Sequence, residues 1–296
     1  MLRIAVPNKG TLSGPAAQML REAGYRQRSS DRDLVCVDAD NDVEFFYLRP
    51  RDIATYVGSG DLDLGVTGRD LLIDADSGAV EILDLGFGGA TFRFAATPGT
   101  PDDPQALAGR RIATSYSGVV RKHLADLGVT ADVIRLDGAV ENAIRLGVAD
   151  VIADVVETGA TLRQVGLVMV GEPILRSSAV LIGRASAVEA APGSTATQGS
   201  EGAASPAVTQ LVRRLQGVLV ARRYVMLAYD VPAERLPDAV ALTPGIESPT
   251  VSPLHREGWL AVNAMVLRAD VHRVMDELYE VGARAILVTD IAASRL

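Results

Sequence analysis

Two aspartates and a threonine-rich turn lie together in residues 147–162 and could form a phosphate-binding site. An apolar run there carries Asp150 and Asp154, breaks at Glu157-Thr158-Gly159-Ala160-Thr161, and continues with helical character. Backbone N–H groups, two hydroxyls and the positive end of a helix all favour a phosphate at such a turn. Carboxylates beside it suit ribose hydroxyls or an accompanying Mg²⁺ ion. An ordinary strand–helix junction, capped by Thr158 or Thr161, would show the same pattern, so both interpretations stay open at this point.

A second candidate for anion binding is the turn Asn8-Lys9-Gly10-Thr11, which follows a short apolar strand at 2–7. Lys9 is one of only two lysines in the chain, and the turn places its charge at the carboxyl end of the strand. Ligands of open α/β sheets usually bind at that edge. Lys9 could simply be solvated, but we favour a ligand role because the turn suits anions.

Composition indicates a globular protein of two or three domains and excludes several function classes. The 296 residues are 48% hydrophobic and 22% charged, as in soluble globular proteins. A net charge of −8 argues against a nucleic-acid partner. No apolar stretch reaches the roughly 20 residues that cross a bilayer, so no membrane partner is expected. The N-terminus shows no signal-peptide pattern, and a single cysteine, Cys36, fits the cytoplasm, where we expect the protein.

Two regions of alternating short strands and helices are expected to form lobes that position these turns. The first lobe is expected to cover 1–98 and 175–216, and the second 99–174. The lobes resemble each other weakly at a fixed offset along the chain. Two related α/β lobes facing across a cleft would explain this repeat. The positions that correspond are Gly60 with Gly147, Asp63 with Asp150, and Thr67 with Asp154.

The C-terminal part is expected to form a separate domain. Residues 185–206, in the first lobe, are almost all small or polar, which is typical of a loosely packed loop, and a helix at 207–216 follows. Residues 217–296 then show strand, helix, two strands, helix and strand, with the first strand at 218–228. This order is the ferredoxin-like βαββαβ arrangement. The expected fold class is therefore α/β, with two lobes around a cleft plus this small domain.

Six motifs stand in order along nearly the whole chain. They are Ala5-Val6-Pro7-Asn8-Lys9-Gly10, Tyr47-Leu48-Arg49-Pro50, Asp63-Leu64-Gly65-Val66-Thr67-Gly68-Arg69-Asp70, Ile134-Arg135-Leu136-Asp137-Gly138-Ala139-Val140-Glu141, Ala153-Asp154-Val155-Val156-Glu157-Thr158-Gly159-Ala160-Thr161-Leu162 and Thr243-Pro244-Gly245-Ile246-Glu247-Ser248-Pro249-Thr250. Together they resemble ATP phosphoribosyltransferase in its long, histidine-regulated form. The resemblance implies lobes like those of type II periplasmic binding proteins and a C-terminal regulatory domain. The stretch 185–206 departs from the family, which is usually shorter there.

The resemblance also implies the first reaction of histidine biosynthesis. N1 of the adenine of ATP displaces pyrophosphate from 5-phosphoribosyl 1-pyrophosphate, with Mg²⁺ required, and gives N1-(5-phosphoribosyl)-ATP. Positive charge develops on the ribose and negative charge on the departing pyrophosphate, so carboxylates are expected near one and cations near the other. The attacking nitrogen has a free lone pair, so a general base is not obviously necessary.

The site residues expected from the resemblance fall into three overlapping groups. Phosphoribosyl pyrophosphate is expected to contact Asp154, Val155, Val156, Glu157, Thr158, Gly159, Ala160, Thr161 and Leu162. ATP is expected to contact Lys9, Gly10, Arg49, Arg69, Asp70 and Leu71. Lys9, Asp154 and Glu141 are the expected catalytic residues, and Asp154 with Glu141 the expected Mg²⁺ ligands. Arg49 could instead be a surface charge, and Arg69 and Asp70 could merely cap a helix.

The resemblance further implies feedback inhibition by histidine and assembly of dimers into hexamers. A site for free histidine needs an acidic residue and polar groups, and we expect Asp230, Ser248 and Thr250 to supply them. These could equally be ordinary turn residues. The competing function is a bilobal protein that senses a nucleotide or an amino acid without catalysis.

Overall fold

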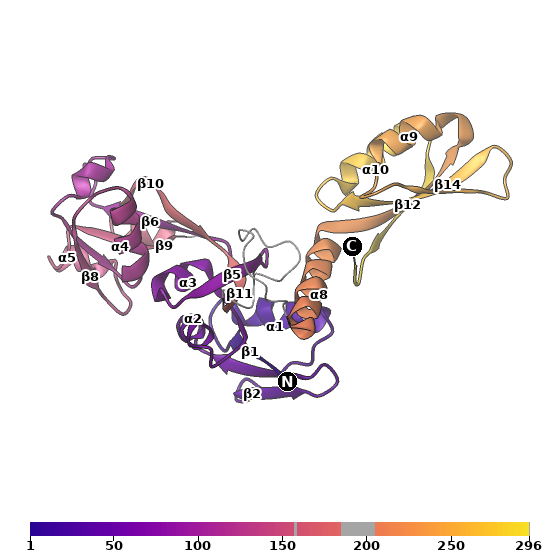
Figure 1. Ribbon diagram of the computed structural model, residues 1–296. Coiled ribbons are helices and arrows are strands. Elements are labelled where there is room, and N and C mark those ends of the chain that lie inside the picture. The colour runs from indigo at the N-terminus through magenta and orange to yellow at the C-terminus, as the bar shows by residue number, and fades with distance from the viewer. Residues whose placement is uncertain (157–158, 185–204, 296) are drawn as a thin grey trace. The chain divides into compact units, whose positions relative to one another are not determined.

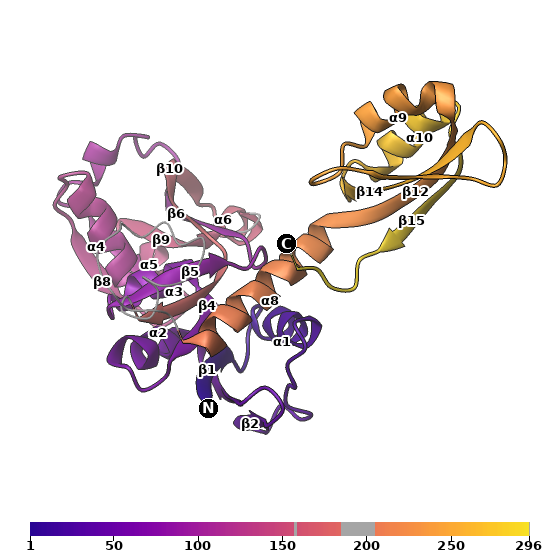
Figure 2. The same cartoon turned by 45° about the vertical axis from the view of Figure 1, so that its right-hand side comes forward.

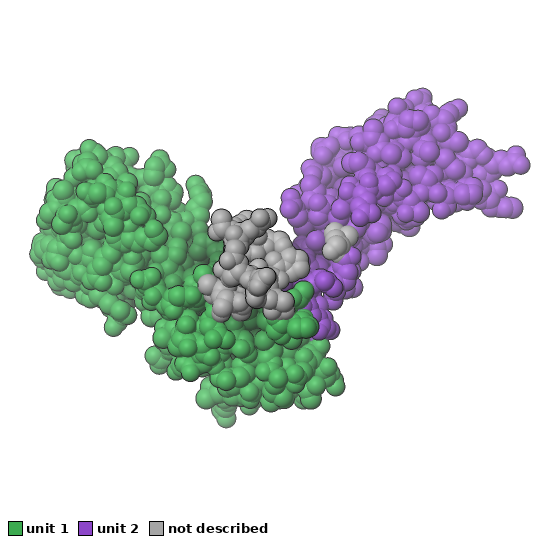
Figure 3. Space-filling model, viewed as in Figure 1, with its two compact units in different colours: residues 1–21, 25–209 green, residues 22–24, 210–296 purple. Residues whose placement is uncertain are grey.

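The computed structural model describes residues 1–156, 159–184 and 205–295 and contains two compact units (Figures 1 and 3). Unit 1 comprises Met1–Arg21 and Tyr25–Thr209, and unit 2 comprises Glu22–Gly24 and Gln210–Leu296. Two sheets belong to unit 1 and a third to unit 2. The expected low-complexity loop lies outside the described residues except for its last two. Within the described ranges, no helix combines the length and apolarity needed to span a membrane.

The first lobe of unit 1 is a six-stranded sheet with the strand order β2-β3-β1-β4-β11-β5. Strands β3 and β4 run parallel to β1, whereas β2, β11 and β5 are antiparallel to their neighbours. Helices α1, α2 and α3 connect the strands. The bounds are β1 Leu2–Pro7, α1 Ser13–Glu22, β2 Val35–Asp38, β3 Val43–Leu48, α2 Pro50–Ser59, β4 Leu64–Gly68, α3 Arg69–Ala75, β5 Ala79–Asp84 and β11 Ala179–Arg184.

Helix α2 shows how the sequence builds this lobe. Ile53, Ala54 and Val57 recur at helical spacing and are buried in the core of the lobe. Pro50 occupies the first turn, where its missing N–H removes no helical hydrogen bond. Gly60 ends the helix with a φ of 87°, a left-handed conformation that glycine adopts without strain. The helix therefore begins directly at the end of β3, and its first turn stays at the edge of the sheet.

The second lobe of unit 1 is a five-stranded sheet with the order β10-β6-β9-β7-β8. Its main core cluster includes Phe92, Phe94, Ile112, Val120 and Val151, which are at most 3% exposed. The bounds are β6 Ala90–Ala96, η1 Pro104–Leu107, β7 Arg111–Thr114, α4 Ser117–Asp126, β8 Asp132–Arg135, α5 Asn142–Arg145, β9 Val151–Val156, α6 Ala160–Gln164 and β10 Val168–Ser177.

The chain leaves the first sheet at residues 85–89 and returns at Ser178. The expectation that the first lobe extends to residue 98 and resumes at 175 is therefore wrong, because β6 pairs with β9 and β10. Its aromatic residues Phe92 and Phe94 fill the core of the second lobe. A short apolar strand does not show by itself which sheet it joins, since strand preference depends on the packing around it.

The internal repeat between the lobes is confirmed by equivalent contacts. In the first lobe, the Asp63 carboxylate accepts a hydrogen bond from the Arg3 N–H at 2.8 Å. In the second, the Asp150 carboxylate accepts from the Arg111 N–H at 3.0 Å. Each aspartate stands just before a strand that pairs in parallel with the strand of its arginine. The Arg111 side chain and N–H lower the pKa of Asp150 to about 2, so this carboxylate is a structural anchor.

Unit 2 contains the expected βαββαβ domain, with the strand order β13-β14-β12-β15 and antiparallel neighbours throughout. Helices α9 and α10 cover one face of this sheet (Figure 2). Val225, Leu227, Tyr229 and Val231 alternate along β12 and are buried beneath them. The bounds are α8 Pro206–Arg223, β12 Tyr224–Pro232, η2 Ala233–Arg235, α9 Leu236–Leu242, β13 Thr250–Pro253, β14 Trp259–Leu267, α10 Val271–Val281 and β15 Arg284–Asp290.

The expected strand at 218–228 is wrong over its first six residues, which continue α8 to Arg223. Leu211, Leu215 and Val218 are at most 3% exposed and are spaced by four and three residues, as on one face of a helix. The neighbouring Leu219 and Val220 produce a short apolar run that is typical of a strand. The segment is helical because the helical spacing of its apolar residues extends over more of the chain than the short apolar run does, and a helix buries those residues on one continuous face.

Candidate active site

A cavity of about 680 Å³ lies between the two lobes of unit 1. The first lobe contributes loops that follow β1, β3 and β4, and the second contributes residues from its facing edge. Gly88, from the segment 85–89 that joins the lobes, and Ser177, the last residue of β10, complete it. The other lining residues are Lys9, Gly10, Thr11, Leu12, Arg49, Pro50, Arg51, Asp52, Gly68, Asp70 and Leu71 from the first lobe, and Ala90, Tyr116, Asp137 and Val155 from the second.

Three parallel strands place the charged residues of the first lobe at one edge. The last residues of β1 and β3, Pro7 and Leu48, are partners in register, and β4 runs parallel on the other side of β1. The residues that follow these strands, Lys9, Arg49 and Asp70, therefore meet at the edge where ligands of α/β sheets bind. The structure brings together at this cavity five of the six residues expected to contact ATP: Lys9, Gly10, Arg49, Asp70 and Leu71.

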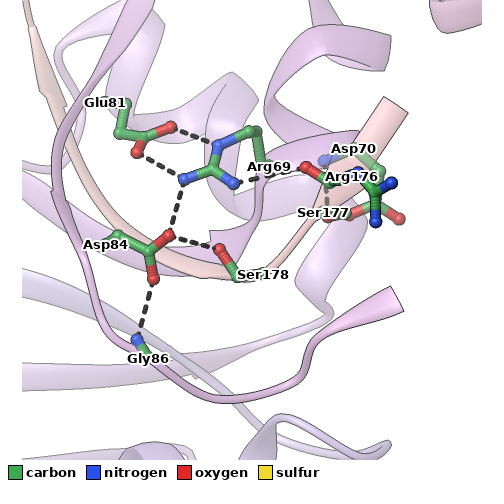
Figure 4. Close-up of polar contacts among 8 residues, drawn as sticks. All are labelled: Arg69, Asp70, Glu81, Asp84, Gly86, Arg176, Ser177 and Ser178. Atoms are coloured by element: carbon green, nitrogen blue, oxygen red, sulfur yellow. Dashed lines mark hydrogen bonds and ion pairs between the residues drawn. The ribbon is translucent and has the colours of Figure 1, made fainter. Parts of the chain in front are cut away.

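Arg69, the sixth residue expected to contact ATP, is held by two carboxylates of β5 and does not line this cavity. Its guanidinium makes two 2.7 Å hydrogen bonds to Glu81 and one of 2.9 Å to Asp84 (Figure 4). The neighbouring Asp70 lines the cavity, and Arg69 does not. The two carboxylates that hold Arg69 lie 12 and 15 residues further along the chain. The sequence of the turn around Arg69 therefore could not predict these two carboxylate partners.

Arg51 is a cavity cation that the sequence analysis missed. It lies in the first turn of α2, donates to Asp74 Oδ2 at 2.8 Å, and stacks 4.9 Å from the ring centroid of Tyr116. Tyr116 belongs to the second lobe, so Arg51 connects the two lobes. Burial, followed by the charge of Asp70, raises the pKa of Tyr116, so its hydroxyl stays protonated at neutral pH. The sequence feature that could have identified Arg51 is its position beside Pro50, opposite Arg49. Pro50 starts α2 at the edge of the sheet, so both arginines are placed there.

The two lobes also meet where α3 approaches the start of α4. Asp74 Oδ1 accepts a 2.8 Å hydrogen bond from the Gly118 N–H, while its other oxygen binds Arg51. The carboxylate thus satisfies an N–H at the start of the helix that would otherwise lack a partner. A Cβ at Gly118 would lie 2.5 Å from the backbone oxygen of Asp74, so this approach requires glycine.

Asp70 is held at the wall of the cavity by Ser177. The Ser177 hydroxyl donates to Asp70 Oδ1 at 2.8 Å and accepts from the Asp70 N–H at 3.1 Å. The two residues are 8% and 7% exposed, and both line the cavity. A buried carboxylate in a fixed orientation is suited to accept hydrogen bonds from ribose hydroxyls or an amino group.

A second cavity, of about 310 Å³, is lined in part by Gly159, Ala160 and Thr161 of the expected phosphate turn. Gly159, with a φ of 69°, directly precedes the short helix α6. Val155 lines both cavities, so the two are adjacent. Glu157 and Thr158 lie outside the described residues. The lining residues are Glu141, Ile152, Asp154, Val155, Val156, Gly159, Ala160, Thr161 and Leu162.

Asp154 and Glu141 face this second cavity together. Burial raises the pKa of Asp154, the Val155 N–H at 2.8 Å lowers it, and the charge of Glu141 raises it, so the net pKa is above its ordinary value. A cation, or hydroxyl donors, would stabilise the charged pair. The described part of the chain contains no group of three or more metal-binding side chains. A metal held here would therefore take only part of its ligands from the protein.

The residues expected to bind histidine lie in unit 2. Asp230 on β12 pairs with Ala261 of β14, and Thr250 of β13 pairs with Asn263 of the same strand. Residues paired across two strands point to the same face of the sheet, and so do residues two apart on one strand, such as Ala261 and Asn263. Asp230 and Thr250 therefore share one face, which is the face opposite α9 and α10. Ser248 lies in the preceding loop and is exposed.

Comparison with known proteins gives one consistent result. The family model for ATP phosphoribosyltransferase (HisG) matches residues 49–217, and the model for the HisG C-terminal domain matches residues 221–293. An ATP phosphoribosyltransferase of Salinispora tropica is 69% identical and one of Streptomyces avermitilis 62% identical, each over 100% of both chains. The solved ATP phosphoribosyl transferase (HisG:HisZ) complex from Thermotoga maritima matches with a TM-score of 0.53 and 26% identity. That match covers 62% of this chain and 88% of that one.

Proposed function

Since this chain belongs to the ATP phosphoribosyltransferase family, which opens histidine biosynthesis, we propose that it condenses ATP with 5-phosphoribosyl 1-pyrophosphate. The observation that carries this proposal is a pair of adjacent cavities, joined at Val155, of which the larger is lined by three cations and three carboxylates and the smaller, among the described residues, by carboxylates as its only charged groups. One cavity presents Lys9, Arg49 and Arg51, and the other presents two carboxylates beside a hydroxyl-bearing turn. The reaction separates charge in the same sense, with a cationic ribose and an anionic leaving group.

The ribose 5-phosphate is assigned to the smaller cavity. The turn that begins α6 offers backbone N–H groups and the Thr161 hydroxyl, and both are donors that phosphate oxygens accept. Asp154 lies on β9, the strand that leads to this turn, and lines the same cavity. Its carboxylate is assigned to the ribose hydroxyls. Its negative charge, with that of Glu141, also stabilises positive charge that develops at the anomeric carbon.

The pyrophosphate and ATP are assigned to the larger cavity. Lys9 and Arg49 stand at neighbouring strand ends, and Arg51 adds a planar fork that suits phosphate oxygens. Asp70 is proposed to hold the ribose or the adenine amino group, since Ser177 fixes its orientation. Placing N1 of the adenine against the anomeric carbon would then need only the correct distance and alignment.

Mg²⁺ fits this site as a partly protein-bound ion. Asp154 and Glu141 are hard oxygen donors on one cavity, and burial, followed by the charge of Glu141, raises the pKa of Asp154. Mg²⁺ is commonly bound by one or two carboxylates together with substrate phosphates. When bound, it would neutralise part of the charge on the phosphoribosyl pyrophosphate.

The proposed reaction is tested by incubating the protein with ATP, 5-phosphoribosyl 1-pyrophosphate and Mg²⁺. We expect pyrophosphate and phosphoribosyl-ATP to appear in equal amounts. Reactions that lack either substrate serve as controls and should give neither product. The alternative, a bilobal sensor, predicts that calorimetry detects nucleotide binding while no pyrophosphate forms, and that result would contradict the proposed chemistry.

Histidine is proposed to inhibit the enzyme by binding the open face of the unit 2 sheet, with Asp230 on its amino group and Thr250 and Ser248 nearby. The shared face of Asp230 and Thr250 supports this assignment. Asp230→Asn should keep the uninhibited turnover and need at least about tenfold more histidine for half inhibition, because a charge-assisted hydrogen bond is lost.

Asp238→Asn, on exposed α9, is the matched control for that variant and should keep wild-type inhibition. Equal sensitivity of Asp230→Asn and the wild type would place the histidine site elsewhere. We also propose that the chain forms homo-oligomers, from dimers to hexamers, which sedimentation with and without histidine would measure.

A further inference from the structure

The chain crosses between the lobes of unit 1 twice, and the two crossings lie side by side. The Leu85 N–H donates to the Ala179 oxygen at 2.9 Å, and the Ala179 N–H donates to the Phe87 oxygen at 2.8 Å. The outgoing segment 85–89 contains three glycines, and Gly86 and Gly88 have φ values of 68° and 66°. Any rotation of one lobe against the other must bend these segments, since hinge motion is absorbed by a few connecting residues.

A cluster of four side chains, which we name the crossover clasp, holds these crossings on the first lobe (Figure 4). It consists of Arg69, Glu81, Asp84 and Ser178. Arg69 joins both carboxylates, and Asp84 Oδ2 also accepts from the Ser178 hydroxyl at 2.8 Å. Asp84 Oδ1 accepts from the Gly86 N–H at 2.8 Å. One carboxylate therefore binds the start of the outgoing crossing and the single residue of the returning one.

The charges of the clasp are strongly stabilised. Burial alone would raise the pKa of Asp84, but the Gly86 N–H, the Arg69 guanidinium and the Ser178 hydroxyl outweigh it and lower the pKa. The side chain of Arg69 is only 24% exposed, and its hydrogen bonds with Glu81 are bidentate. A bidentate arginine pair with little exposure is more directional than an ordinary surface ion pair.

The clasp and the cavity share one piece of backbone. Arg69 and Ser178 lie in the clasp, whereas their chain neighbours Asp70 and Ser177 are bonded to each other at the cavity wall. Arg69 Nη1 also donates to the carbonyl oxygen of Arg176 at 3.3 Å, so it contacts β10 of the second lobe directly (Figure 4). A shift of the clasp would therefore move the Asp70–Ser177 wall and the second lobe together.

We propose that Arg69 is a positioning residue for the transferase reaction. By fixing both crossings to the first lobe, it sets the angle at which the second lobe brings Asp154 and its turn toward the ATP half of the site. Arg69 touches neither substrate in this proposal. The inference rests on the substrates proposed above, which turnover of the wild-type protein tests separately.

The test compares Arg69→Gln with Arg111→Gln. Arg111 is a matched control, because it makes a bidentate pair with Asp150 and a 2.8 Å bond to the Gly147 carbonyl, all within the second lobe. At a temperature where circular dichroism shows both variants folded, Arg69→Gln should raise KM for both substrates and lower kcat. The combined loss in kcat/KM should be about 10- to 100-fold, because reacting groups are misplaced by a fraction of an ångström or more. Arg111→Gln should stay within about twofold of the wild type, since it moves neither crossing.

A distance measurement separates positioning from simple loss of stability. Spin labels at Tyr56→Cys and Leu146→Cys, in a Cys36→Ala background, report one exposed position in each lobe. Labelled chains are diluted with unlabelled ones so that distances within a chain dominate. The distance distribution should broaden in Arg69→Gln and not in Arg111→Gln. Wild-type kinetics and an unchanged distribution in folded Arg69→Gln would overturn the proposal, as would equal kinetic losses in the two variants.

Discussion

Asp154→Asn should reduce turnover by about 10²- to 10³-fold, the range typical for removing one charged stabilising group from an active site. The substitution keeps the shape of the side chain and removes the charge that faces the ribose. Near-normal turnover would remove Asp154 from the catalytic residues. Thr161→Val, which removes a proposed phosphate donor from the same cavity, should act in the same direction and chiefly raise KM for phosphoribosyl pyrophosphate.

Asp154→Asn should not destabilise the ligand-free fold at neutral pH. The pKa of Asp154 is raised in the folded state, chiefly by burial and then by Glu141. Stability from such a group is fully present below the unfolded pKa of about 4 and is lost as pH rises through the folded value. Asp154→Asn should therefore unfold at an equal temperature near pH 3.5 and at a higher temperature than the wild type at pH 7. Thermal unfolding across this range, without substrates, measures the difference.

Asp150, four residues earlier, provides a control of opposite sign. Its pKa is lowered to about 2 by Arg111, so its stability is present above pH 4 and is lost as pH falls toward 2. Asp150→Asn should therefore lower stability at pH 7, by less than about 1 kcal/mol because the pair is partly exposed. It should keep wild-type turnover. A stabilised Asp150→Asn or a destabilised Asp154→Asn would contradict the electrostatic assignment.

Gly118→Ala should be the second strongly impaired variant, with kcat/KM lower by about 100-fold. The new Cβ would meet backbone atoms of Asp74 at 2.5 to 3.0 Å, so α4 would have to move away by about 1 Å. That movement would break the Asp74–Gly118 hydrogen bond and separate Tyr116 from Arg51. A misplacement of this size is enough to cost two orders of magnitude in rate. Steady-state kinetics with both substrates measures the loss.

Gly14→Ala is the matched control for Gly118→Ala. Each glycine is the second residue of a helix and follows a serine, but no atom lies within 4 Å of a Cβ at Gly14. Alanine there should leave turnover unchanged and stabilise the helix slightly, since alanine favours helices more than glycine does. Equal turnover of the two variants would show that the close approach of α3 and α4 does not matter for catalysis.

Several features of this protein follow from the sequence alone. The turns at Lys9 and at Gly159 and the βαββαβ order of the C-terminal domain depend on residues close in the chain, and the repeat between the lobes is a comparison of two such local patterns. Glycines at positive φ, prolines at helix starts and apolar periods act over such short windows. Parallel strands then bring their carboxyl ends to one edge, so Lys9, Arg49 and Asp70 could be expected to lie together.

Tertiary structure alone decided which sheet β6 joins, where Arg69 points and how the lobes touch. Arg69 turns away from the cavity because Glu81 and Asp84 arrive beside it from β5, and Arg51 reaches Tyr116 because α4 packs near α3. Tertiary structure also placed Asp154 and Glu141 on one cavity beside the turn at Gly159, whose phosphate role stays a prediction. These outcomes depend on pairings between residues far apart in the chain. Local residue preferences carry no information about such pairings, because the partner is supplied by packing.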